Sequence, residues 1–344
     1  MSKPIVADLG SHTIKVINNR NLSVINSQYP QGKPNISLSQ LPLITRCSLQ
    51  TPFSRGCIIA FDALPNEFTE ILDNRSLVMS TPPLLPQSLA SKLDEYLFES
   101  CNVASLYRIS APAAAIKAPE LNSRDFPAHI VLDLGFQHCT CSALIFGQLV
   151  QHSVRRNDAG GLLLDNSFGI DPNKKNIFSA LPDHQILRQQ LRQLLLCGIP
   201  EGVISLTENN KLEPVKIENR PYYEVRGHEQ FGLISAIIDP IQLNLAQKGA
   251  VELVKECICS LPYSVSVVAA ENLILIGGLS KSFRLQSILE EKLVKTGIIG
   301  KIIVTKEPEL TTIKGLEVIA KEYKTVNKDL YFEYGKDIFC KRFL

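Results

Sequence analysis

The chain of 344 residues contains one short pattern twice, and this repeat limits what the chain can fold into. The first copy, VADLGSHTIKV, begins at Val6, and the second copy, VLDLGFQHCTCSAL, begins at Val131. In each copy an apolar run leads into Asp-Leu-Gly, a short polar stretch follows, and apolar residues then alternate again. This alternation is typical of two strands joined by a tight turn. The repeat therefore predicts two similar units, each opened by a β-hairpin.

The elements expected around the two hairpins follow a similar order in both halves of the chain. In the first half we expect strands at 5–9, 13–17 and 22–26, then a strand beginning at 76, a helix at 89–100, and a strand with an Ala-rich helix within 103–118. In the second half we expect a strand-turn-strand from 130, helices within 157–168, 184–196 and 247–262, a strand at 272–276, a helix at 285–293 and a strand from 301. Strands mixed with helices in this way predict an α/β architecture with two similar lobes.

Two polar, weakly periodic segments interrupt this order, at 30–55 and 166–239. We expect them to be a small excursion from the first lobe and an insertion in the second. The first lobe is then predicted to comprise 1–29, 56–128 and 311–344, and the second lobe 129–165 and 240–310.

Charge and cysteine content exclude several classes of function. A net charge of +2 gives no case for nucleic-acid or membrane binding. The nine cysteines are scattered and odd in number, so we interpret them as buried thiols in a reducing compartment rather than zinc ligands. We find neither a secretory leader nor an apolar run that could span a bilayer, and so expect an intracellular protein without membrane contact.

The two Asp-Leu-Gly turns have a physical use in holding phosphate. Gly10 and Gly135 allow the backbone to approach an anion, and turn N–H groups can donate to phosphate oxygens. Asp8 and Asp133 could then hold magnesium through water. One such turn is more often ordinary, but two in matching contexts predict a nucleotide cleft between the lobes.

A third element with the same potential is a Gly-Gly turn. Gly277 and Gly278 follow the apolar strand NLILI and lead towards a helix. Glycine here allows close packing of a flat ring or a phosphate, although such a turn alone is more often structural.

With these three elements in order, the chain resembles the actin family over essentially its whole length. The resemblance implies a ribonuclease H-like, two-lobed α/β fold, with duplicated βββαβα units around a nucleotide cleft. Asp8, Gly10, Ser11 and Lys15 match the family's first phosphate loop. Asp133 and Gly135 match its second phosphate loop, and Gly277 and Gly278 match its adenosine loop. The resemblance implies ATP as a ligand, with magnesium held through water near Asp8 and Asp133.

Several positions depart from the family pattern. Phe136 aligns with the second aspartate of the second loop, and a phenyl ring cannot hold magnesium or water. His12 replaces a glycine; it could donate to phosphate, but we expect a solvated turn residue. Ala111 aligns near the glutamine that positions the hydrolytic water.

The resemblance also aligns Arg188 and Gln189 with a Lys-Glu pair beside the adenosine, so a positive charge is kept and a carboxylate becomes an amide. Hydrolysis needs a positioned water and a metal held in register. Each lost polar group typically costs about 3 kcal/mol of transition-state stabilisation. We therefore expect no catalytic residues, weak or absent ATP binding and negligible hydrolysis.

Within the family, the segments PFSRGCIIAFD, SLYRISAPA and NDAGG are similar to the sixth actin-related-protein subfamily. That similarity implies a structural subunit of a nuclear chromatin-remodelling complex that exchanges a histone variant. Its partners would be the remodeller ATPase and other nuclear subunits, with histones as a further candidate. We do not expect a filament, because the 30–55 segment is short and 166–240 departs from actin throughout.

Two alternatives stay open. A cytoplasmic capping subunit at the pointed end of dynactin would have the same fold, and AENLILIGG fits it equally well. An active ATPase or phosphotransferase of the wider actin, sugar kinase and heat-shock chaperone superfamily would explain the duplicated turns, but Ala111 and Phe136 argue against it. Partner contacts are predicted at 30–55, at 166–240 and in the tail from Asp329. Direct DNA contact is left open, the candidates being Lys336, Lys341 and Arg342, although a solvated chain end is the more expected reading.

Overall fold

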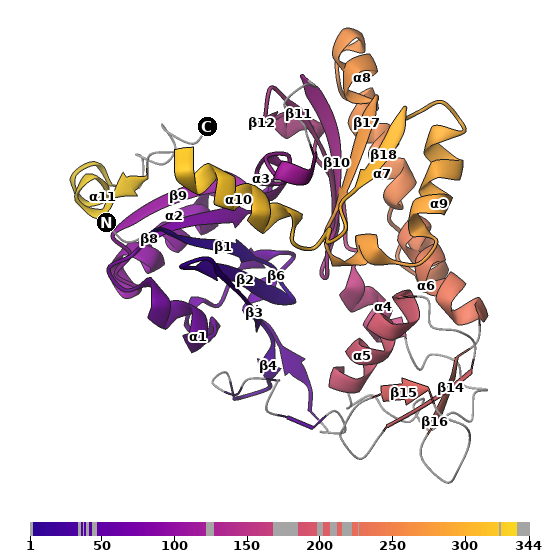
Figure 1. The fold of residues 1–344 in the computed structure, drawn as a ribbon, viewed down its shortest axis with the longest axis horizontal. Coiled ribbons are helices and arrows are strands. Elements are labelled where there is room, and N and C mark those ends of the chain that lie inside the picture. Colours follow the sequence, from indigo (N-terminus) through magenta and orange to yellow (C-terminus); the bar gives the residue numbers. More distant parts are fainter. Residues whose placement is uncertain are drawn as a thin grey trace.

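The strands of the chain form two six-stranded sheets, one in each lobe, with helices α3 (Ala111–Ala115) and α10 (Thr311–Glu322) between them (Figure 1). The computed structural model describes residues 3–33, 36, 38, 41–42, 47–121, 127–167, 185–197, 202–206, 212–214, 222–225, 227–322 and 325–335.

The first sheet has the strand order β19-β9-β8-β1-β2-β3. Strands β1, β2 and β3 form an antiparallel meander, and β8 and β9 extend the sheet on the other side of β1, parallel to it. The strands are β1 (Ile5–Leu9), β2 (Thr13–Asn18), β3 (Asn21–Asn26), β8 (Ser76–Thr81), β9 (Ser105–Ser110) and β19 (Val326–Asn327). Helix α2 (Gln87–Glu95) joins β8 to β9.

The second sheet repeats this plan, with the order β12-β11-β10-β17-β18 and β13 also paired with β11. Here β10 and β11 form the opening hairpin, and β17 and β18 run parallel to β10. The strands are β10 (Ala128–Leu134), β11 (Cys139–Ile145), β12 (Gln148–Leu149), β13 (Arg155–Asn157), β17 (Asn272–Ile276) and β18 (Lys301–Val304). The shared strand order confirms the duplicated two-lobed α/β fold predicted from the repeated turn.

The two helices between the sheets each pack on the sheet of the other half of the chain. Helix α3 follows the first sheet in sequence, yet Ala113, Ala115 and Ile116 pack against strands of the second. Helix α10 follows the second sheet, yet it covers β1 and β8 of the first. The helices approach so closely that a Cβ at Gly315 of α10 would lie 1.9 Å from the carbonyl oxygen of Ala114.

The remaining elements form the outer layers of the lobes. Two small hairpins extend the first lobe, β4 (Tyr29–Pro30) with β5 (Leu49–Gln50) and β6 (Phe53–Ser54) with β7 (Cys57–Ile58), and α1 (Asn66–Thr69) and α11 (Lys328–Tyr334) complete it. The second lobe adds α4 (Gly161–Ser167), α5 (Gln185–Leu196), α7 (Ala250–Cys259), α8 (Tyr263–Ala269) and α9 (Leu285–Leu289). It also contains two elements that the sequence patterns did not predict, a three-stranded sheet of β14 (Gly202–Leu206), β15 (Leu212–Pro214) and β16 (Tyr222–Val225), and helix α6 (Gly227–Ile238).

The cysteines of the described ranges are free thiols, and most of them are buried. Cys197 and Cys259 are exposed, which differs from the expectation of buried residues throughout. Within the same ranges no helix is long and apolar enough to cross a bilayer, and no three metal-ligating side chains gather in one place. The basic tail residues predicted from the sequence lie outside the described residues.

Candidate functional site

A cavity of about 530 Å³ lies between the lobes, where the turns of the two hairpins meet the Gly-Gly turn. All but one of the residues predicted for ligand binding line it: Asp8, Gly10, Ser11, His12, Lys15, Asp133, Gly135, Gly277 and Gly278. The repeated turns therefore come together at one site, although 125 residues separate the two aspartates in sequence (133 minus 8).

The first turn carries a buried ion pair. Asp8 and Lys15 face each other directly across the β1-β2 hairpin, so the strand register itself brings them together. Lys15 Nζ lies 3.1 Å from Asp8 Oδ2, and Ser80 of β8 donates to Asp8 Oδ1 at 2.7 Å. Both oxygens of Asp8 are thus held by side chains of the first lobe.

The second turn carries a carboxyl that is hard to ionise. Burial, reinforced by the nearby charge of Asp8, raises the pKa of Asp133 to about 7, while Lys15 lowers it. Gly277 packs against the same carboxyl, because a Cβ there would lie 2.6 Å from Asp133 Oδ1. Gly277 also has a φ of +90°, which favours glycine, whereas a Cβ at Gly278 would meet open space.

Phe136 forms the wall between this cavity and a smaller one of about 340 Å³. The His12 ring packs edge-on against the Phe136 ring, with the centroids 4.7 Å apart. Burial, followed by the charge of Arg192, lowers the pKa of His12 to about 4, so the ring is neutral at physiological pH. His12 is therefore a packed, uncharged residue, which corrects the expectation of a solvated turn histidine.

Sequence comparisons identify the fold family. The sequence model described as Actin matches residues 35–194. A Yarrowia lipolytica protein named actin-like protein ARP6 is 20% identical, over 98% of this chain and 97% of its own. Proteins named actin-related protein 6 are 22% identical in Neurospora crassa, over 98% of this chain and 94% of theirs, and 23% identical in Arabidopsis thaliana, over 92% and 91%. The chain is therefore similar to proteins of the actin family, by the family model over part of its length and by these relatives over most of it.

Proteins of the actin family generally bind ATP with magnesium, and the residues of this cavity fit that pair in part. Asp8 and Asp133 are close enough for their charges to interact, and oxygen ligands of this kind suit magnesium. A metal ion near them would relieve the repulsion that raises the pKa of Asp133. Lys15 would offer a cation to phosphate, and the open space beside Gly278 would admit a base or ribose.

Two side chains that line the cavity are apolar at positions where the resemblance to the actin family implies polar groups. Ala111 lines the cavity where the resemblance implies a water-positioning amide. Phe136 offers an apolar ring beside the second turn.

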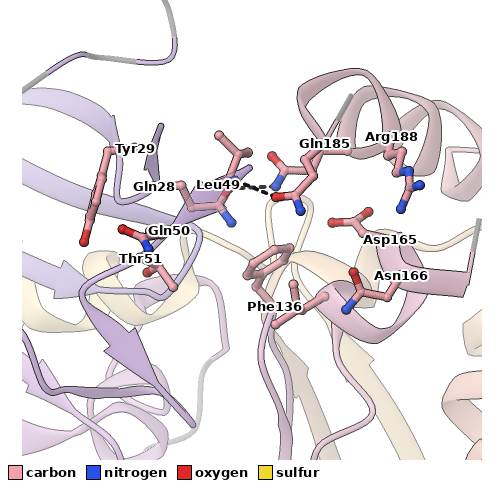
Figure 2. Close-up of a pocket in the computed structure, with 12 residues that line it drawn as sticks. Gln28, Tyr29, Leu49, Gln50, Thr51, Phe136, Asp165, Asn166, Gln185 and Arg188 are labelled. Carbon is pink, nitrogen blue, oxygen red and sulfur yellow. Dashed lines mark hydrogen bonds between the residues drawn. The ribbon is translucent and has the colours of Figure 1, made fainter. Parts of the chain in front are cut away.

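The positive side chain that the resemblance implies beside the adenosine does not line the central cavity. Arg188 lines the smaller cavity (Figure 2), and the central cavity is lined instead by Arg192 and Gln193, one turn further on. Arg192 Nε lies 2.6 Å from Asp165 Oδ1 of α4, and its Cζ lies 5.4 Å from the Phe136 centroid. Arg188 therefore lies outside the central cavity, one helical turn from the arginine that lines it.

The sequence reasoning did not single out Arg192, Asp165 or Ser80. Arg192 had a detectable signal, because it follows Arg188 at i+4 on an amphipathic helix and so shares its face. Ser80 had no signal of its own, since only the parallel pairing of β8 with β1 brings it to Asp8.

Proposed function

We propose that the chain is a non-filamentous actin-related protein that serves as a structural subunit of a nuclear chromatin-remodelling complex of the histone-variant-exchange type. Its partners are the remodeller ATPase and other nuclear subunits, with histones as a further candidate. The observation that carries this proposal is the pair of apolar side chains, Ala111 and Phe136, in an otherwise recognisable actin cleft. Similarity over nearly the whole chain to proteins named actin-related protein 6 supports it.

The cleft in this proposal binds ATP weakly or not at all and hydrolyses it negligibly. One missing transition-state contact typically costs about 3 kcal/mol, or two orders of magnitude in rate, and this cleft lacks two such groups. Phosphate release by the purified chain with Mg·ATP should match the protein-free background. Magnesium-dependent turnover comparable to that of actin would reject this part of the proposal and favour the ATPase alternative.

Affinity purification of the tagged full chain, followed by mass spectrometry, tests the choice of complex. The expected result is a remodeller ATPase with its associated nuclear subunits, at levels well above a tag-only control. Recovery of dynactin subunits instead would favour the cytoplasmic capping function, and fluorescence microscopy of the tagged chain would show the matching compartment.

Sedimentation in polymerising salt tests the absence of filaments. The chain should remain in the supernatant at concentrations at which actin pellets. A sedimenting polymer would contradict the structural-subunit proposal and would require a contact surface along the 30–55 and 166–239 segments.

A further inference from the structure

Contacts between side chains join the two hairpin turns across the lobes. His12 of the first turn packs on Phe136 of the second at 4.7 Å, and Arg192 lies over the same Phe136 ring at 5.4 Å. Asp165 fixes Arg192 from behind through their 2.6 Å ion pair. Gly161 leaves the space for this stack, since a Cβ there would lie 2.9 Å from both the Phe136 ring and the Arg192 guanidinium. The two side chains that depart from a phosphate-binding pattern therefore contact each other.

A second set of contacts lies at the mouth of the smaller cavity (Figure 2). Gln189 Nε2 donates to Gln28 Oε1 at 2.8 Å, and the backbone N–H of Leu49 donates to Gln185 Oε1 at 2.7 Å. Gln185 and Gln189 are one turn apart on α5, so both point to the first lobe. Gln28 and Gln189 are only 5% and 7% exposed, and each amide supplies the other with a hydrogen-bond partner that water cannot readily replace in the closed form.

A third set is made by the β6-β7 hairpin, whose turn reaches the second lobe. Gly56 N donates to Gln137 Oε1, and Gln137 Nε2 donates to Phe53 O, both at 2.9 Å. The backbone at Gly56 has a φ of +74°, and a Cβ there would lie 2.1 Å from the His138 ring. The hairpin therefore fits closely against the loop that follows Phe136.

We propose that these contacts hold the two lobes closed whether or not a nucleotide is bound. A ligand closes a cleft only to the extent that it binds the closed form more tightly than the open form. In this chain, opening the cleft without a ligand would already have a cost, because it would expose the Phe136 ring to water and separate the Gln28–Gln189 pair. The closed form is thus stabilised from within the chain.

This inference goes beyond the proposed function, because it concerns the chain by itself and does not depend on which complex the chain joins. It also gives Phe136 and His12 a structural role. Phe136 stands where the resemblance implies a polar side chain, and together with His12 it supplies an inter-lobe contact. A partner would then meet one fixed shape rather than a shape that changes with nucleotide.

Hydrogen-deuterium exchange on the full chain, with and without Mg·ATP, tests the proposal. In the wild type, the amides of β7 and α5 should exchange equally slowly in both conditions. The double variant Phe136→Ala/Gln189→Ala should exchange at least tenfold faster at β7, and small-angle scattering should show a larger radius of gyration. The control Gln190→Ala changes the exposed neighbour of Gln189 on the same helix and should behave as the wild type.

Two results would overturn the proposal. One is rapid exchange at β7 and α5 in the nucleotide-free wild type, whether or not Mg·ATP slows it. The other is equal exchange in the double variant and in Gln190→Ala. If circular dichroism shows that the double variant is unfolded, the exchange rate of the nucleotide-free wild type still decides the question. Neither result involves recovered partners, so the proposal stands or falls separately from the structural-subunit function.

Discussion

At the scale of single residues, the cleft concentrates its unusual chemistry in Asp133. A carboxyl in an apolar site, near a second carboxylate, is more stable with its proton than without it. The pKa of about 7 follows from this burial and from Asp8, and the Lys15 ammonium offsets only part of the effect. Asp133 therefore carries a cost in stability that a structural residue would not need.

Replacing Asp133 by asparagine should make that cost measurable. An unfolded Asp loses its proton near pH 4 and the folded one near pH 7, so the wild type loses stability as the pH rises through this window. The shift of about 3 units corresponds to at most about 4 kcal/mol. Asp133→Asn should therefore gain stability relative to the wild type between pH 4 and pH 8.

Urea unfolding of both proteins at pH 4, 6 and 8 would measure the difference between their free energies of unfolding. His12 and His138, whose pKa values burial lowers to about 4, have the opposite pH dependence, but they are present in both proteins and cancel in the difference. A gap that does not change with pH would contradict the assignment of Asp133 as a carboxyl that holds its proton near neutrality.

Sequence reasoning found the residues of the turns and missed their contacts. Asp8 and Lys15 were expected from the resemblance to the actin family, and the register of the hairpin places them opposite each other. His12 and Phe136 were each noted as departures, yet nothing in a linear pattern shows that two such residues, from different lobes, pack on each other. Arg192 was missed for a related reason, since residues four apart share a helix face and only packing decides which one reaches a cavity.

At the scale of elements, an ion pair joins α4 to α5. Asp165 and Arg192 are each 7% exposed at their side chains and lie 2.6 Å apart. Burial raises the pKa of Asp165 to about 6 even though Arg192 lowers it. Such a pair costs desolvation and is strongly destabilising when only one partner is removed.

Removing one partner should therefore cost more than removing both. Arg192→Met should destabilise the chain by about 3–5 kcal/mol, because it leaves Asp165 buried and unpaired. The double variant Asp165→Leu/Arg192→Met should recover most of that loss. Urea unfolding of the single and double variants checks this, and purely additive losses would show that the pair has no coupling.

The crossing of α3 and α10 depends on the absence of a side chain at Gly315. A Cβ there would lie 1.9 Å from a backbone carbonyl that cannot rotate away. Gly315→Ala should force the helices apart at a cost of about 3 kcal/mol. The matched control is Gly232→Ala in α6, where a Cβ meets nothing within 4 Å. The higher helix propensity of alanine should leave the stability of this variant unchanged or raise it by up to about 1 kcal/mol.

Thermal unfolding of both glycine variants separates these two effects. A large drop in melting temperature for Gly315→Ala alone is the expected result. Equal shifts for the two variants would show that the close approach of α10 to Ala114 is not required for stability.

The elements that the sequence did predict have a clear period or a fixed neighbour. Amphipathic helices such as α5 and α7 and the buried strand β17 were found from their patterns. Helix α6 was missed because the segment is apolar on most sides in its second half and Gly-rich at its start, so it shows little helical alternation. The β14–β16 sheet joins strands of 5, 3 and 4 residues, which are too short to show a clear alternating pattern.

At the scale of the whole molecule, the repeated turn predicts two lobes but not how they depend on each other. Each sheet has an inner face covered by a helix that follows the other sheet in sequence. The sequence predicted the Ala-rich helix α3 but not α10, and local periodicity does not show which lobe either helix covers. The exchange of helices makes the lobes one cooperative unit.

Cutting the chain between Leu121 and Pro127 should reveal this dependence. A fragment that ends at Leu121 keeps the first sheet except β19 but lacks α10, so Val6 and Val78 on the covered face would meet water. A fragment that begins at Pro127 lacks α3 and exposes Val131 and Ile274 in the same way. Each fragment alone should therefore show fast amide exchange and aggregate, because an apolar face of this size is not stable in water.

Mixed during refolding, the two fragments should reassemble into one complex with slow exchange in both sheets. A first fragment that folds alone and protects β1 and β8 from exchange would mean that the crossing helices stabilise the molecule without joining the folding of its lobes.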